Sequence, residues 1–206
     1  MRLPVALVIS GMLLASLPAA ASERGFFVGA GIGQMTTDVD DVWGSSYNFD
    51  ESDTGFKIFG GYKFFSWLGV EGAFIDGGEP SVKESYAGAS EKLSIGVDTI
   101  VGAAIFALPI GEKFELFLKP GWAYWDSTTK YHYSSSSIDF KESSDDSGSA
   151  FFIGAGAGFY FNENFGARVE YEWFDVAPEW DDDEDEFVDE LDANSGFLSA
   201  SFVYRF

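Results

Sequence analysis

The 206-residue chain contains no cysteine, so disulfide bonds contribute nothing to its stability. It has a single histidine and only 12 lysine and arginine residues against 34 aspartate and glutamate residues, which gives a formal net charge of −22. Nucleic acids bind basic surfaces through their phosphates, so this charge argues against a nucleic-acid partner. We expect no cofactor, no resident metal and no catalytic residue.

Long apolar runs are absent beyond the N-terminus. The first segment has a basic Arg2, an apolar stretch at 5–17 and the small residues Ala19, Ala20 and Ala21, which together are typical of a secretory signal peptide. The stretch is shorter than the roughly 20 residues of a membrane-spanning helix. The sequence therefore predicts a signal peptide at 1–21 and a single exported domain at 22–206.

Short segments of period-two alternation make up most of the exported domain, which is rich in aromatic residues and glycine. Side chains on a strand alternate between its two faces, so each segment predicts one β-strand. The eight expected strands are 25–35, 55–64, 68–75, 93–106, 114–125, 150–161, 165–174 and 196–206.

The connections between these strands alternate strictly between long and short. The long ones are 36–54, 77–92, 126–149 and 175–192, and the short ones lie near 65–67, 109–113 and 162–164. A transmembrane barrel has short turns on its periplasmic side and long loops outside, whereas a β-sandwich has no reason to alternate. The pattern predicts an all-β fold, an eight-stranded antiparallel up-and-down transmembrane β-barrel.

The last strand shows how the two faces differ. Leu198, Ala200, Phe202, Tyr204 and Phe206 share one face, and the other face is mostly polar. In a barrel, the apolar face meets lipid and the polar face meets the lumen. We expect this strand to pair with 25–35, because an open strand edge in a bilayer would leave backbone groups unsatisfied.

Aromatic residues gather where the expected strands end. Phe64, Phe65 and Trp67 lie at one short turn. At the opposite ends lie Trp122, Tyr124, Trp125, Tyr171 and Trp173. Two aromatic girdles at the membrane interfaces are typical of membrane barrels.

Charged residues occupy the faces that we assign to the lumen. The set is Lys57, Lys63, Glu71, Asp98, Glu115, Lys119, Arg168, Glu170, Glu172 and Arg205, with five cations and five carboxylates. An eight-stranded barrel is just wide enough for side chains to fill it, and buried charges must pair. Glycines at 29, 31 and 33 and at 154, 156 and 158 leave room for long side chains. We expect a network that plugs the lumen; a narrow polar conduit is the alternative.

The excess negative charge is concentrated in the four long loops, which hold 25 carboxylates and only four lysines. The acidic run 181–186 could bind calcium, bridge to lipopolysaccharide through divalent cations, or be a solvated loop. Aromatic residues in the loops could form a binding surface or pack the loops together; they are Trp43, Tyr47, Tyr131, Tyr133 and Trp180.

One short segment, His132-Tyr133-Ser134, is similar to a segment of outer-membrane lipid A deacylases. It departs from theirs because Ser135 stands where they have Asn, and because it lies far from the C-terminus. A catalytic triad also needs an oriented third group, for which Glu142 is the candidate. We keep a lipid A-modifying hydrolase only as a distant alternative.

Several segments together carry a family resemblance, namely G-F-F-V-G-A-G-I-G at 25–33, W-L-G-V-E-G-A-F at 67–74, R-V-E-Y-E-W-F at 168–174 and the terminal strand. The chain resembles the OmpA-like eight-stranded outer-membrane barrels across its exported part, with the barrel domain only and no peptidoglycan-binding domain. The resemblance implies that Phe202, Tyr204 and Phe206 form the signal read by the barrel-assembly machinery.

From these observations we expect a monomeric protein of the outer membrane of a Gram-negative bacterium, surrounded by lipid and lipopolysaccharide. Its expected role is structural or interactive: membrane integrity, adhesion or host interaction through acidic extracellular loops. A small-solute porin is the alternative function.

Overall fold

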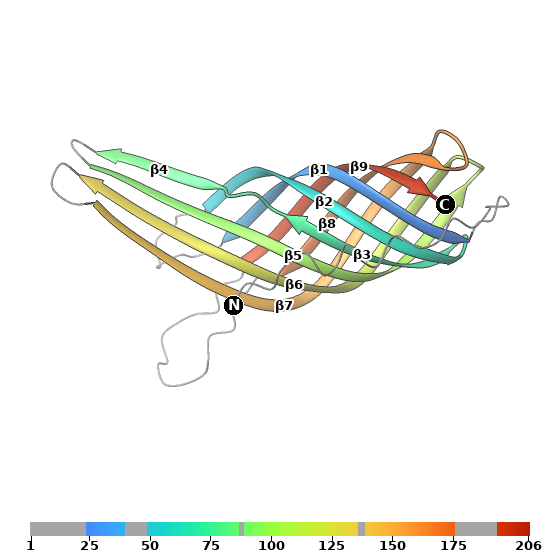
Figure 1. The fold of residues 1–206 in the computed structure, drawn as a ribbon, viewed down its shortest axis with the longest axis horizontal. Helices are drawn as coiled ribbons and strands as arrows, with labels where there is room; N and C mark the ends of the chain where they lie inside the picture. Colours follow the sequence, from blue (N-terminus) through green and yellow to red (C-terminus); the bar gives the residue numbers. More distant parts are fainter. Residues whose placement is uncertain (1–23, 40–48, 87–88, 136–138, 176–192) are drawn as a thin grey trace.

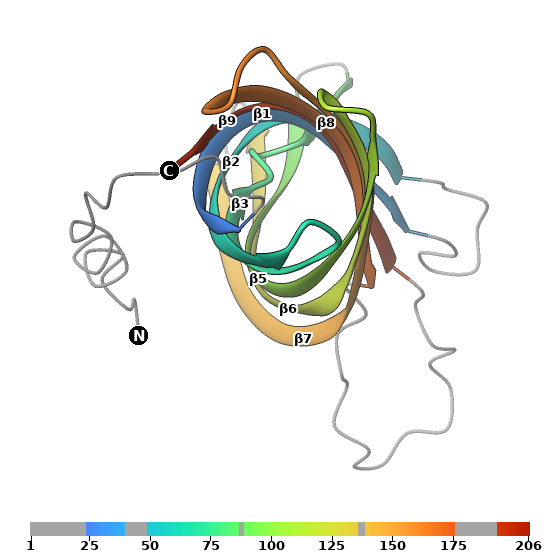
Figure 2. The ribbon, with the colours of Figure 1, turned by 90° about the vertical axis from the view of Figure 1, so that its right-hand side faces the viewer.

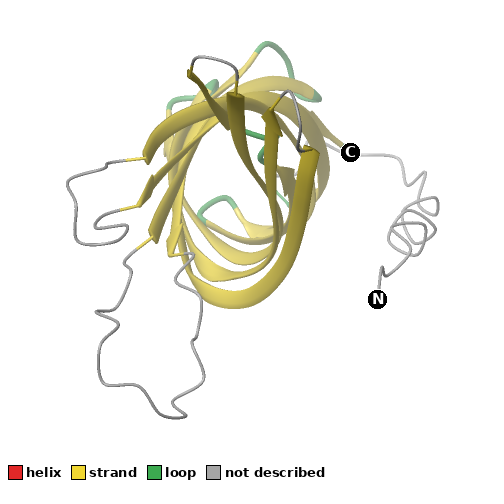
Figure 3. Cartoon of the chain, turned by 90° about the vertical axis from the view of Figure 1, so that its left-hand side faces the viewer, coloured by secondary structure: helices red, strands yellow, loops and turns green. Residues whose placement is uncertain are grey.

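The structure, a computed structural model, describes residues 24–39, 49–86, 89–135, 139–175 and 193–206 (Figure 1). Its described part consists of strands with short connections (Figure 3). In chain order the strands are β1 (Gly25–Val39), β2 (Phe49–Phe65), β3 (Leu68–Asp76), β4 (Ser81–Tyr86), β5 (Ala89–Ile110), β6 (Phe114–Ser135), β7 (Asp139–Tyr160), β8 (Phe165–Asp175) and β9 (Ala193–Arg205). Within these residues, no helix is long and apolar enough to cross a membrane.

Eight of the strands close into a ring in the order β3-β2-β1-β9-β8-β7-β6-β5, and the pairing of β3 with β5 completes it. Every pair is antiparallel, and Figure 2 shows the ring end-on. The terminal strand joins the first one, with Phe27 opposite Arg205 and Gly33 opposite Ser199. The predicted eight-stranded up-and-down barrel and its closing seam are confirmed.

The strands on one wall extend far past the rest of the barrel. β5, β6 and β7 each have 22 residues, and β4 pairs with the outer part of β5 (Figure 1). Much of what we predicted as loop at 77–92 and 126–149 is therefore strand. Cross-strand pairing satisfies the backbone groups of these polar segments, and threonine and tyrosine favour the extended conformation.

The outward and inward faces follow the alternation expected for β9. Leu198 and Phe202 are exposed on the outside, where Phe202 keeps 62% of its surface accessible, while Ser199 and Ser201 are buried inside. The apolar outer face is the one that meets lipid. Most large exposed side chains of the barrel belong to this belt.

The orientation of β5 differs from our prediction. Val97, Val101 and Ile105 are buried inside, whereas Asp98 and Ile100 are exposed on the outer face. Both faces of β5 are apolar over much of its length, so alternation alone did not distinguish them, and a shift by one residue exchanges every side chain. Our placement of Asp98 in the lumen is wrong.

Candidate functional site in the barrel lumen

A cluster of six buried charged side chains crosses the middle of the barrel. Lys57 comes from β2, Glu71 from β3 and Lys119 from β6. The other three alternate along β8 and therefore share its inner face; they are Arg168, Glu170 and Glu172. Strands that are distant in sequence thus bring three cations and three carboxylates together in a space closed to solvent.

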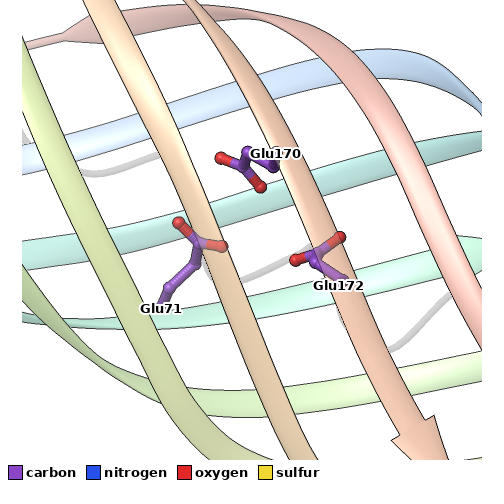
Figure 4. Close-up of side chains that lie close together, drawn as sticks. All are labelled: Glu71, Glu170 and Glu172. Atoms are coloured by element: carbon purple, nitrogen blue, oxygen red, sulfur yellow. The ribbon is translucent and has the colours of Figure 1, made fainter.

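Lys119 lies at the centre of this cluster. Its Nζ donates hydrogen bonds to Glu71 Oε1 at 2.9 Å, Glu170 Oε2 at 2.7 Å and Glu172 Oε1 at 2.6 Å. Lys57 also pairs with Glu170, and with Glu172 at 2.7 Å. Figure 4 shows the three carboxylates pointing toward one another across the lumen. Lys119 uses all three of its ammonium donors on carboxylates and Lys57 uses two, which offsets the cost of their burial.

Arg168 links the cluster to the aromatic residues around it. Its Nη1 donates to Glu71 Oε2 at 3.0 Å, and its guanidinium carbon lies 4.9 Å from the ring centre of Phe27 and 5.1 Å from that of Phe117. A guanidinium group over aromatic rings is a favourable cation–π arrangement. The rings therefore support the charge as well as fill the space beside it.

A second group of charges lies closer to the short turns and is centred on Glu115. This carboxylate pairs with Lys63, accepts a hydrogen bond from Arg205 at 3.0 Å and another from the Tyr160 hydroxyl at 2.6 Å. Arg168 Nη2 lies 3.6 Å from Glu115 Oε1 and connects the two groups. The charged network therefore runs from the middle of the barrel to its periplasmic end.

Glycines give these side chains room. A Cβ atom at Gly154 would lie 3.0 Å from Lys119 Cε, and one at Gly158 would lie 3.0 Å from Glu115 Cγ. Other glycines face aromatic rings, since a Cβ atom at Gly33 would lie 2.6 Å from the Phe197 ring. The glycine pattern makes space for aromatic side chains as well as charged ones.

Toward the extracellular end, the lumen is filled by apolar side chains. They are Met35, Ile75, Val97, Trp125, Phe152, Phe174 and Phe197, all buried in one cluster. Our prediction assigned Trp125 to an aromatic girdle, but it points inward. These residues alternate in the same inward phase as the charged residues. The alternation therefore indicates an inward position for them as well, but we predicted only the charged residues to lie in the lumen.

Nine of the ten residues predicted for the network lie on the inner face, and Asp98 does not. Its strand partners are Asp76 on β3 and Asp126 on β6, so three aspartates lie side by side. Within the described part of the chain, the lumen network holds five cations and four carboxylates rather than five of each.

Two other groups of acidic residues have the composition of a possible metal site. The carboxylates of Glu71, Glu170 and Glu172 offer oxygens within 4.8 Å of one another, as a metal site would require. Lys57 and Lys119, however, donate into the same space, so their charge already serves the role of a cation. The acidic run 181–186 lies outside the described residues.

The segment around His132 lies on the extracellular part of β6, where His132 Nε2 contacts Asp139 Oδ1 at 2.7 Å. Glu142 is opposite Tyr131, the neighbour of His132, and so belongs to the other face of the sheet. Our candidate for the third member of a triad is therefore wrong.

Comparisons with known proteins agree with this architecture. Residues 6–206 match the family model described as an outer membrane protein beta-barrel domain. Ail, the attachment invasion locus protein of Yersinia pestis, solved with the heparin analogue sucrose octasulfate, is 21% identical, with a TM-score of 0.51 over 88% of this chain and 99% of Ail. Neisserial surface protein A is 14% identical, with a TM-score of 0.51 over 88% of this chain and 97% of its own. No curated protein matches the sequence.

Proposed function

This chain belongs to the outer membrane protein beta-barrel family, and from that premise we propose that it is a closed barrel that serves the cell surface rather than a channel. It is a protein of the outer membrane. Its proposed role is to hold a wall of extracellular strands and acidic loops at the surface, for membrane integrity and for attachment to other surfaces.

The filled lumen carries the first half of this proposal. The charge network of Lys57, Glu71, Lys119 and the β8 residues spans the barrel, and the apolar cluster around Trp125 lies above it. An ion would have to break several buried ion pairs and then pass an apolar layer. Both steps are costly, because unpaired charges in a low-dielectric interior lose their hydration.

Planar-bilayer recording tests the closed lumen. The refolded protein, inserted at increasing protein-to-lipid ratios, should give no stable, reproducible conductance steps, while a general porin recorded in the same membrane serves as the positive control. Regular steps whose frequency grows with the amount of protein would refute the closed barrel.

One observation favours the conduit as the second candidate. The hydroxyl groups of Thr99, Ser199 and Ser201 are buried and have no hydrogen-bond partner among the described residues. Buried hydroxyl groups normally bond to protein or water, so they are places where water could enter the lumen. Conductance that disappears in a Ser199→Val, Ser201→Val double variant would support this candidate.

The surface role rests on the extracellular strands and on the acidic loops. Ail, the attachment invasion locus protein, has a similar fold, and β4 to β7 of this chain form a paired extension beyond the rest of the barrel. Bacteria expressing the protein should attach to a host-cell layer more than cells carrying an empty vector. Equal attachment at equal surface expression would count against the adhesive role.

A further inference from the structure

The four lysines of the long loops come together on the extracellular wall. These lysines are Lys83, Lys92, Lys130 and Lys141, and the four predicted loop segments that contain them also hold 25 carboxylates. Strand pairing places Lys92 opposite His132, and His132 opposite Lys141. The register continues to Lys83 on β4, which is the strand partner of Lys92. Lys130 is two residues from His132 on β6. We call Lys92, Lys130, His132 and Lys141 the basic row.

Strand geometry puts the basic row on one face. Directly opposite residues of an antiparallel pair point to the same side, and residues two apart on a strand do as well. Lys92, Lys130 and Lys141 are exposed, and His132 is half-buried. The other face holds Glu91 and Glu142. Asp139 and Asp145 share the face of the basic row, because their strand partners Ser134 and Thr128 lie two residues from His132 and Lys130.

The basic row is only partly neutralised by the protein. Lys130 pairs with Glu79, and His132 contacts Asp139. Among the described residues, neither Lys92 nor Lys141 has an ion-pair partner. Lys83 and Lys92 are strand partners, and like charges at directly opposite positions of a sheet repel one another, so an anion bound along the row would stabilise these strands.

The position of the basic row indicates which anion reaches it. From Lys92, every second residue of β5 leads down the same face to Ile100, which is 58% exposed in the lipid-facing belt. The eight residue steps from Lys92 to Ile100 span about 26 Å of strand, or roughly 19 Å of height at a tilt near 45°. The row therefore stands beside the membrane, above the lipid chains, at the level of the phosphorylated sugars of the outer leaflet.

We propose that the basic row binds phosphate groups of the lipopolysaccharide that surrounds the barrel. Phosphates on neighbouring sugars would lie across β5, β6 and β7, where strands are about 4.8 Å apart and each carries at least one basic side chain of the row. Lysine ammonium groups bind phosphate as point charges and adapt to its position.

The test compares two double variants of the same strands. Lys92→Gln with Lys141→Gln removes the two lysines without ion-pair partners, and Glu91→Gln with Glu142→Gln is the matched control on the opposite face. Binding of purified lipopolysaccharide to each protein in phosphatidylcholine nanodiscs is measured, and strand content by circular dichroism confirms folding. The lysine variant should bind about thirtyfold more weakly, since each of the two lysines near an anionic surface contributes about 1 kcal/mol. The control should bind as well as wild type or better.

Three further measurements test whether phosphate charge is what the row recognises. Wild-type binding should weaken as sodium chloride rises and should fall to the level of the lysine variant for dephosphorylated lipopolysaccharide. Equal binding by wild type and the lysine variant, or no effect of removing phosphate, would overturn the proposal. Sucrose octasulfate that binds at the row in place of lipopolysaccharide would also overturn it, because the partner would then be a soluble sulfated sugar.

Discussion

At the scale of single residues, Lys119 is the side chain on which the lumen network most depends. It contacts three carboxylates and is fully buried. Replacing it, as in Lys119→Met, leaves Glu71, Glu170 and Glu172 with one cation fewer in the same closed space. We expect a loss of about 3–5 kcal/mol in the free energy of unfolding, which is typical when one partner of a buried ion pair is removed. Urea unfolding of the protein in lipid vesicles measures it.

Lys130→Met is the control for this variant. Lys130 also pairs with a glutamate, but both side chains are about half exposed. Exposed ion pairs contribute about 0–1 kcal/mol, so this variant should unfold close to wild type. Similar losses in the two variants would mean that burial does not determine what the network contributes.

Asp98 supports a prediction of the opposite sign. It stands directly between Asp76 and Asp126, and like charges at such positions destabilise a sheet. Asp98→Asn should therefore raise the free energy of unfolding by about 0.2–1 kcal/mol. The gain should shrink at high ionic strength because salt screens exposed charges. A loss of stability at low salt would contradict this account of the three aspartates.

At the scale of strands, the family resemblance leads us to expect an assembly signal in β9. Phe206 and Phe161 are both 48% exposed, but only Phe206 belongs to the terminal aromatic pattern with Phe202 and Tyr204. Phe206→Ala should lower the amount of protein in the outer membrane several-fold, as measured by immunoblot of membrane fractions. Phe161→Ala, which removes a ring of equal exposure, should not. If both variants assemble equally, the terminal aromatic residue is only a lipid contact.

The strands also show what can be predicted from sequence. Alternation in β1, β2, β8 and β9 is clear because one face of each is polar or glycine-rich, so strand number, order and closure follow from the pattern. β5 was assigned the wrong orientation because Val97 and Ile100 make both of its faces apolar. The extensions of β6 and β7 were missed because serine-rich segments have no apolar face; their pairing with each other holds them in place.

The lumen network, too, could be predicted from the sequence only in part. Charged side chains on the lipid-facing side of a barrel are destabilising, so lysine, arginine and glutamate in the membrane-spanning strands are expected in the lumen. Nine members of the network could be identified in this way. Which cation meets which carboxylate depends on shear between strands, as with Lys57 and Glu172, and no local pattern contains that information. The convergence of Lys92, His132 and Lys141 likewise depends on register across three strands.

At the scale of the whole molecule, the barrel should fold without its most acidic loop. Asp175 of β8 is paired with Asn194 of β9, so residues 176–192 connect two strands that already meet. Replacing them with a four-residue Gly-Ser turn removes ten carboxylates and shortens the closed loop, which changes the unfolding free energy by only about 1 kcal/mol.

The same variant tests whether the acidic run 181–186 binds calcium. Heat released by wild type in a calcium titration should vanish in the loop-replaced protein if the run 181–186 holds the ion. Loss of the folded barrel in this variant would show that the loop contributes to the fold itself.

The lumen network also determines when the barrel is complete. Its members come from β2, β3, β6, β8 and β9, and Arg205 joins only when the last strand has taken its place beside the first. Until then, a growing sheet in the bilayer carries charged side chains that lack their ion-pair partners, which raises its free energy. We therefore expect a misregistered or unfinished sheet to be less stable in the bilayer than the closed ring, because its buried charges lack partners. The network would then favour completion of the barrel during assembly.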